Sequence, residues 1–405
     1  MRPTSALVAA GVLVSGTSAE NYLGFNSGAT LADRSAKFKA DWLAEFKTAQ
    51  NLENAPGKFN AVRLYTNIQA YSEDTPIEAF EAAIETNTKI LLGIWTSGTN
   101  SIEKELSALK KAIDKYGSKF TDLVIGMSIG SEDLYRDSET GVKNEAGIGA
   151  GPDTLIKFIN DYKKAVAGTA LKGVPIGHVD TWDAWTNGTN KAVIDAVDWI
   201  GVDEYPYYEN GKGNDIKNSG TLFDRAFNAV EGVAGDKPIW VTETGWPSSG
   251  PNWDQAVSSV ENAKYYWDEV GCRKLFNKVP TFWYNLRDSN PDNKMKFAIT
   301  NNLSTKPLFD LTCPTKFDTP TSTPTSAAPS STGVSAPSRS ATSASGSTNT
   351  TGGSGTNAGA DNSAAESGSG TEEADAIPTG SGASIGRSLS VVVSLALVAG
   401  VFTLF

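Results

Sequence analysis

The sequence predicts a (β/α)8 barrel followed by a disordered Ser/Thr-rich stalk, and three observations carry this prediction. Short apolar runs alternate with amphipathic stretches, which is typical of parallel strands covered by helices. Eight such units fit into about 290 residues, the size of a (β/α)8 barrel. Beyond Cys313 the composition changes to Ser, Thr, Gly, Ala and Pro. An open doubly wound sheet is the alternative, but no Gly-rich nucleotide turn follows the first predicted strand.

The predicted strands are short runs rich in β-branched and aromatic residues. In chain order they span 22–26, 61–66, 89–96, 123–129, 174–179, 199–204, 239–242 and 281–285. The clearest helical stretches have apolar residues at a helical spacing and span 76–85, 102–116, 154–166 and 254–270.

Polar and aromatic residues gather where these strands end. They are Asn26, Arg63, Tyr65, Trp95, Glu132, His178, Asp180, Glu204, Tyr205, Glu243, Trp246, Trp283, Tyr284 and Asn285. Active sites of such barrels lie at the carboxyl ends of the strands. Aromatic faces for C–H stacking, beside groups that hydrogen-bond hydroxyls, predict a carbohydrate site there.

Both ends of the chain are predicted to be targeting segments. Residues 1–19 combine Arg2, an apolar run at 6–14 and small residues up to Ala19, as in a secretory signal peptide. The barrel is expected over 20–313, and a glycosylated, disordered linker over 314–380. Residues 381–405, with small residues near Gly380 and a terminal apolar tail, predict a glycosylphosphatidylinositol (GPI) attachment signal that is removed in the mature protein. A transmembrane helix is the alternative.

Charge and cysteine content agree with an extracellular protein. The formal net charge is −11, and no basic cluster suggests nucleic acid as a partner. The two cysteines, Cys272 and Cys313, are expected to form a disulfide, since an even pair usually bonds in an oxidising compartment. Asn187, Asn302 and Asn349 open N-glycosylation sequences.

Two glutamates follow apolar runs in the same way. Glu243 ends the run 239–242, and Glu132 follows the run 123–129. Strands four and seven lie on roughly opposite sides of an eight-stranded barrel, so the two carboxylates are expected to face each other, about 5–5.5 Å apart if they serve retaining glycoside hydrolysis. Among their neighbours, Asp133 is expected to cap a helix, Arg136 to form a surface ion pair and Asp203 to accept a supporting hydrogen bond.

The motifs SIGSE (128–132), VDEYPYY (202–208), WVTETGWPSSG (240–250) and VRLYT (62–66) resemble glycoside hydrolase family 17, the β-1,3-glucanases. The resemblance covers about residues 22–313, and the signal, stalk and anchor resemble its fungal wall-anchored members. It implies a TIM barrel, retention of configuration and neither a metal nor an organic cofactor. It places the proton donor and base on Glu132 and the nucleophile on Glu243, and it gives Tyr205 a hydrogen bond to that nucleophile.

Further residues are expected to bind the sugar. They are Arg63, Tyr65, Ser131, Tyr205, Trp246, Trp283 and Tyr284. One position departs from the pattern, because Ser131 stands where many relatives in this barrel clan have an Asn that contacts the sugar 2-hydroxyl.

Three functions remain open at this point. The first is endo-hydrolysis of β-1,3-glucan in the cell wall, by a monomer held outside the plasma membrane by a GPI lipid. The second is glucanosyl transfer through the same glycosyl-enzyme, with the choice made by acceptor-side aromatics such as Trp182, Trp185 and Trp283. The third is a wall glucan-binding protein without catalysis, which would not need both glutamates.

Overall fold

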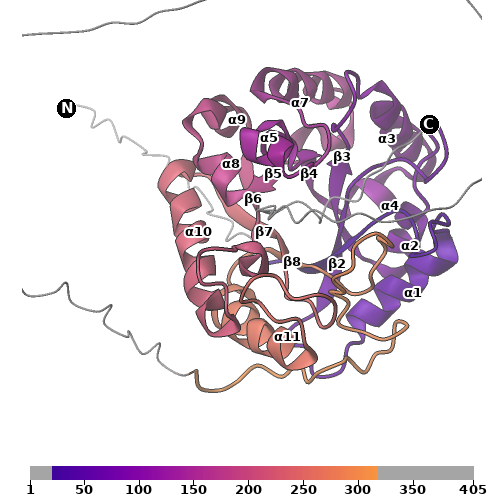
Figure 1. The fold of residues 1–405 in the computed structure, drawn as a ribbon. Coiled ribbons are helices and arrows are strands. Elements are labelled where there is room, and N and C mark those ends of the chain that lie inside the picture. Colours follow the sequence, from indigo (N-terminus) through magenta and orange to yellow (C-terminus); the bar gives the residue numbers. More distant parts are fainter. Residues whose placement is uncertain (1–20, 318–405) are drawn as a thin grey trace, which may run out of the picture. The chain divides into compact units, whose positions relative to one another are not determined.

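The computed structural model of the protein describes residues 21–317, in which eight parallel strands close into a barrel in sequence order (Figure 1). The strands are β1 (Leu23–Ser27), β2 (Phe59–Leu64), β3 (Lys89–Ile94), β4 (Val124–Ser131), β5 (Ile176–Thr181), β6 (Trp199–Asp203), β7 (Ile239–Thr244) and β8 (Thr281–Trp283). Since β8 also pairs in parallel with β1, the predicted (β/α)8 fold is confirmed.

Helices surround the strands on the outside (Figure 1). They are α1 (Lys39–Gln50), α2 (Ala79–Thr86), α3 (Glu103–Tyr116), α4 (Ser118–Thr121), α5 (Asp133–Asp137), α6 (Glu139–Lys143), α7 (Pro152–Val166), α8 (Trp182–Thr186), α9 (Lys191–Ala196), α10 (Ser219–Ala234) and α11 (Val260–Tyr266). Short 3-10 turns are η1 (Ala170–Gly173), η2 (Gly188–Asn190), η3 (Pro206–Tyr208) and η4 (Ile216–Asn218), and the π-helix η5 spans Trp267–Leu275.

The last helical stretch differs from the prediction of one helix over 254–270. Helix α11 begins only at Val260, because the Ser259 hydroxyl accepts the backbone N–H of Asn262 and so caps the first turn. The preceding residues form a turn that is closed by a bridge between Trp253 and Ala256. The strand boundaries also move, because β4 continues to Ser131 and β8 ends at Trp283.

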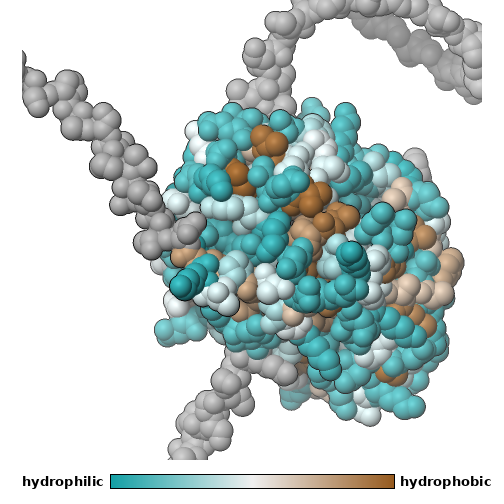
Figure 2. Space-filling view, turned by 90° about the horizontal axis from the view of Figure 1, so that it is seen from below, coloured by the Kyte–Doolittle hydropathy of each residue, from teal (hydrophilic) through white to brown (hydrophobic). Residues whose placement is uncertain are grey.

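The barrel interior is filled by side chains from six strands. They are Ala61, Leu91, Val179, Trp199, Trp240 and Phe282. The Trp199 and Trp240 rings stack with centroids 4.5 Å apart. Gly177 makes this packing possible, since a Cβ there would lie 2.3 Å from the Trp199 ring. On the face shown in Figure 2 hydrophilic residues predominate, and hydrophobic residues form only small groups.

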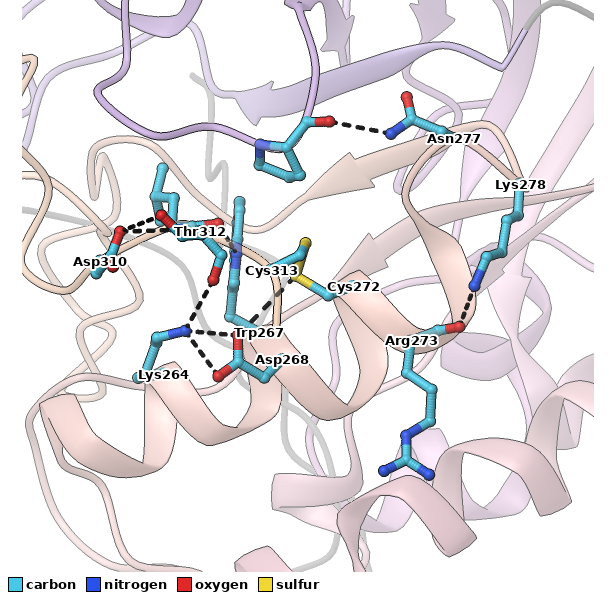
Figure 3. The surroundings of a disulfide bond; sticks show 12 residues. Lys264, Trp267, Asp268, Cys272, Arg273, Asn277, Lys278, Asp310, Thr312 and Cys313 are labelled. Atoms are coloured by element: carbon cyan, nitrogen blue, oxygen red, sulfur yellow. Dashed lines mark hydrogen bonds and ion pairs between the residues drawn. A yellow bond between two sulfur atoms is a disulfide. The ribbon is translucent and has the colours of Figure 1, made fainter. Parts of the chain in front are cut away.

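A disulfide joins Cys272 on η5 to Cys313, with Cα atoms 5.5 Å apart, so the predicted pairing is confirmed (Figure 3). Beside it, Trp267 Nε1 donates to the Leu311 carbonyl at 3.2 Å and Lys264 Nζ to the Thr312 carbonyl at 3.3 Å. Phe317 packs under the Arg273 guanidinium, 4.7 Å from ring centroid to Cζ. These contacts extend a little beyond the boundary predicted at Cys313.

Replacing both cysteines by serine is expected to lower the free energy of unfolding by about 2–4 kcal/mol. The bond closes a loop across a sequence separation of 41 and so restricts the unfolded chain. Thermal unfolding with and without reductant measures the effect, and the chain's cysteine content of two makes the reductant specific to this bond. An unchanged melting temperature, or two thiols labelled in the denatured, unreduced protein, would contradict the expectation.

Several predicted features lie outside the described residues. They are the signal peptide, most of the linker, Asn349, the attachment point near Gly380 and the C-terminal segment. Asn187 and Asn302 are described and both are exposed, so either side chain is open to glycosylation. Within 21–317, no helix has the length and apolar character needed to cross a membrane.

Candidate active site

The Glu243 carboxylate on β7 is the centre of a converging set of hydrogen-bond donors. Its Oε1 accepts from Arg63 Nη1 at 2.5 Å and from the Tyr65 hydroxyl at 2.5 Å. Its Oε2 accepts from the Tyr205 hydroxyl at 2.7 Å. Burial and the negative charge of Glu243 raise the pKa of Tyr65 and that of Tyr205 well above the usual value, so both hydroxyls keep their protons. The Glu243 carboxylate is therefore fixed in orientation, and its side chain is only 3% exposed.

Arg63 connects the two strand ends that carry the glutamates. It lies on β2 and is 1% exposed, so its charge needs partners. Besides Glu243, Nη1 donates to Asn26 Oδ1 at 2.9 Å, and Nη2 donates to the Ser131 hydroxyl at 2.9 Å. The Asn26 amide in turn donates to the Thr242 and Phe282 carbonyls, both at 2.9 Å. One buried guanidinium thus links Glu243 to the residue that precedes Glu132.

Glu132 follows β4 in a turn that needs an unusual backbone. It has φ 56°, in the left-handed region, and Gly130 two residues earlier has φ 87°. The backbone N–H of Glu132 donates to the Val179 carbonyl at 2.8 Å. A Cβ at Gly130 would lie 2.4 Å from Asp133 Oδ2, so glycine is required for steric as well as conformational reasons.

Two expectations for the neighbours of Glu132 are wrong. Arg136 was expected at the surface, but its side chain is 3% exposed and its Nη2 donates to Glu132 Oε2 at 3.2 Å. Asp133 does not cap a helix; it is the first residue of α5, and its carboxylate accepts the Ser131 N–H at 2.8 Å and the Thr96 hydroxyl at 2.7 Å. The reason is that the turn folds these side chains inward, against the loop after β3. Asp203 supports β7 as expected, by accepting from the Thr242 hydroxyl at 2.7 Å.

The pKa of Glu132 is raised to about 7. Burial is the largest cause, and the negative charges of Glu243 and Asp180 act in the same direction, against the positive charges of Arg136 and Arg63. Arg63 links the surroundings of the two carboxyl groups, because it donates to Glu243 and to Ser131, the residue before Glu132. The pair is asymmetric, since one carboxylate is held by three donors and the other holds a proton near neutral pH.

Of three aromatic residues that were predicted to bind the sugar, one lies at the site and two lie in the hydrophobic core. Tyr284 faces the site, with its ring centroid 5.9 Å from that of Tyr205 and its pKa raised well above the usual value, first by burial and then by the charge of Glu243. Trp246 and Trp283 are each 2% exposed and lie in the hydrophobic core. The Trp246 indole donates to the Val257 carbonyl, and the Trp283 ring packs 4.9 Å from the Trp267 ring. Both indoles are enclosed by other side chains, so their predicted contact with sugar has no support in this arrangement.

A cavity of about 570 Å³ opens beside Tyr65 and Trp95, between the loops that follow β1, β2 and β3. Its wall includes Gln69, Tyr71 and Glu105, which were not among the predicted site residues. Glu105 is buried on α3 and accepts the Asn67 N–H at 2.8 Å, and burial raises its pKa to about 7. The burial of Glu105 could have been predicted from the sequence. Glu105 lies three residues after Ile102 and four before Leu109, on the apolar side of the predicted helix. Tyr71 is in a loop without any motif.

No metal centre is apparent within 21–317, where no group of three or more His, Cys, Asp and Glu side chains could hold an ion.

A closed parallel barrel with two glutamates at its strand ends, one held by three donors and one with a raised pKa, defines the class of barrel glycosidases that act through two carboxyl groups. Residues 24–301 match the family model described as the BtgE/BtgC glycoside hydrolase domain, and the chain belongs to this family. The resemblance to glycoside hydrolase family 17 is thereby confirmed.

Similar curated proteins are named probable glucan endo-1,3-beta-glucosidase eglC. The one from Aspergillus niger is 50% identical over 310 residues, which cover 76% of this chain and 67% of the relative. The one from Emericella nidulans is 53% identical over 293 residues, covering 72% and 62%. The alignments therefore span about two thirds of the length of these relatives.

Among solved structures, a glycoside hydrolase family 17 β-1,3-glucanosyltransferase from Rhizomucor miehei superposes with a TM-score of 0.56. It is 22% identical, and the match covers 71% of this chain and 98% of that one, which shows the shared fold.

Proposed function

We propose that the chain hydrolyses β-1,3-glucan internally, with retention of configuration at the anomeric carbon. The observation that carries the proposal is the asymmetry of the two glutamates. Glu243 is oriented by Arg63, Tyr65 and Tyr205, as a nucleophile requires. Glu132 keeps a proton to near pH 7, as a general acid requires. The names of relatives that are about half identical support glucan as the substrate.

The reaction has two steps. A Glu243 oxygen attacks the anomeric carbon while the bond to the leaving oxygen breaks, and that oxygen takes the Glu132 proton. The glycosyl-enzyme ester then meets water, which loses a proton to Glu132 as it attacks the same carbon and releases Glu243. Arg63 and the two tyrosine hydroxyls orient the Glu243 carboxylate before attack and receive it on release.

Activity is expected to fall as pH rises through about 7, because the general acid Glu132 must be protonated for the first step. In Arg136→Gln a positive charge that lowers the pKa of Glu132 is lost, so the alkaline limb of kcat/KM should move to higher pH by roughly one unit. Arg136→Lys is the matched control, since it keeps the charge and should keep the limb near its original place. A limb that does not move in Arg136→Gln would show that Glu132 does not control it.

Laminari-oligosaccharides of defined length test the whole proposal. Proton NMR of the first minutes should show the β-anomer as the initial product, and the products should be shorter than the substrate. Products longer than the substrate would favour glucanosyl transfer, and an initial α-anomer would exclude retention. Absence of any turnover by the folded protein would favour a binding protein.

We further propose that the enzyme acts outside the cell, as a monomer, at the wall and the outer face of the plasma membrane, held by a GPI lipid. The proposal rests on the composition of 1–19 and 381–405. Phospholipase C specific for phosphatidylinositol should release active enzyme from membranes, and light scattering of the released enzyme should give the mass of one chain. Retention of the tail 381–405 in the mature protein would contradict the lipid anchor.

A further inference from the structure

His178 is the chain's single histidine and lies on β5 with both ring nitrogens hydrogen-bonded. Nδ1 is 2.7 Å from the Ile129 carbonyl oxygen on β4, and Nε2 is 2.8 Å from Asp180 Oδ2. The side chains of His178 and Asp180 are each 0% exposed, so no solvent can replace either contact.

The partners decide the protonation of the ring. A carbonyl oxygen only accepts, so Nδ1 must carry a proton. Asp180 accepts three backbone N–H groups, those of Leu134, Tyr135 and Thr181, at 2.9, 3.2 and 2.9 Å. A carboxylate at Asp180 only accepts, so Nε2 is then the donor of the 2.8 Å contact, and a ring that donates from both nitrogens is an imidazolium.

The surrounding charges agree with this assignment. Burial alone would lower the pKa of His178, but the hydrogen bond and charge of Asp180, together with the charge of Asp133 on α5, outweigh it and raise that pKa above the usual value. From α8 the ring meets the edge of Trp185, which carries no charge, at 5.4 Å between centroids. The Thr96 hydroxyl, in the loop after β3, lies close to Gly130, as His178 Nδ1 also does.

These contacts enclose the turn that presents Glu132. Ile129 and Gly130 lead into it, and Leu134 and Tyr135 are the second and third residues of α5, directly beyond it. The His178 ring therefore connects the Ile129 carbonyl, which precedes the turn, to the Asp180 carboxylate. That carboxylate accepts the N–H groups of Leu134 and Tyr135, which follow the turn. Since Glu132 has a left-handed backbone, it depends on such fixed points on both sides.

We propose that His178, as an imidazolium bridging Ile129 and Asp180, is a positioning residue that fixes the β4–α5 turn and thereby the place of the Glu132 carboxyl group. This inference rests on the proposed function, in which Glu132 is the proton donor. His178 touches neither carboxyl group of the reacting pair among the described contacts, so it acts through Asp180 and the backbone.

Nitrogen NMR of the full-length protein labelled at histidine tests the protonation directly, because only one imidazole contributes. Both nitrogens should be protonated at pH 6, and the titration midpoint should lie above about 6.5. In Asp180→Asn the amide can donate to a neutral ring, so the midpoint should fall by about one unit or more. A neutral ring at pH 6 in the unaltered protein would overturn the assignment.

Kinetics of His178→Gln test the positioning. Two laminaribiosides that differ only in the leaving group are compared, phenyl against 2,4-dinitrophenyl, and kcat/KM is measured because it reports the first step alone. A misplaced Glu132 should lower kcat/KM on the phenyl substrate by about 10²-fold. On the dinitrophenyl substrate the loss should stay below about fivefold, because that leaving group needs no proton.

Val193→Ala is the control for general destabilisation. Val193 is buried in the core on α9, so its truncation should lower the melting temperature. It should not change the ratio of kcat/KM on the two substrates. Equal losses on both substrates in His178→Gln would reduce His178 to a structural residue and overturn the proposal. Should His178→Gln not fold, Asp180→Asn undergoes the same comparison, and an unchanged ratio there overturns it.

The two proposals fail in different ways. If Glu132→Gln leaves the ratio of kcat/KM on the phenyl substrate to kcat/KM on the dinitrophenyl substrate unchanged, Glu132 is not the general acid. This conclusion holds whatever the nitrogen NMR signal of His178 shows. If Glu132→Gln changes the ratio but His178→Gln does not, the function stands and the positioning role fails.

Discussion

Glu243→Ala is expected to lose roughly 10⁴- to 10⁶-fold in kcat on laminarin, because the covalent step has no nucleophile. The truncation leaves a space beside Arg63, Tyr65 and Tyr205, whose donors then face a vacant carboxylate position. Azide can enter that space and attack the anomeric carbon of a substrate with a good leaving group. The product should be the glycosyl azide of inverted configuration, which NMR identifies.

Glu269→Gln on the π-helix η5 serves as the matched control, since it alters an acidic residue that pairs with Arg273 on the outer helix. Its activity and azide response should equal those of the unaltered protein. An azide product of retained configuration from Glu243→Ala would exchange the roles of the two glutamates.

Glu132→Ala is expected to lose about 10²- to 10⁴-fold on laminarin, which needs a proton on its leaving oxygen. With a dinitrophenyl glycoside the first step should persist, while the second slows because no base activates the water. The glycosyl-enzyme should therefore accumulate, and intact-mass spectrometry should find one sugar unit added at Glu243. Azide should speed its release and give the β-glycosyl azide, the opposite anomer from that of Glu243→Ala.

Glu132→Asp provides a graded comparison, since it keeps a carboxyl group but shortens its reach. It should retain more activity on laminarin than Glu132→Ala does. If Glu132→Ala loses equally on laminarin and on the dinitrophenyl substrate, Glu132 is not the proton donor.

The barrel, the position of both glutamates at its rim and the disulfide could all be predicted from the amino-acid sequence. Strand composition and spacing are local properties, and in a parallel barrel every strand ends on the same rim, so Glu132 and Glu243 had to lie there. The pairing of Cys272 with Cys313 followed from their number alone.

The direction of the side chains that follow the regular part of each strand could not be predicted, because it depends on packing in three dimensions. Trp246 and Trp283 looked like sugar contacts on the rim, yet both indoles turn into the core, where burying a large apolar ring is favoured. Arg136 was read as a surface residue, but the left-handed turn at Glu132 folds it inward. His178 was one polar residue among many at the rim until the contacts of its two nitrogens connected it to Ile129 and Asp180, on either side of the Glu132 turn. Each of these outcomes depends on partners far away in the chain, and a local pattern carries no information about them.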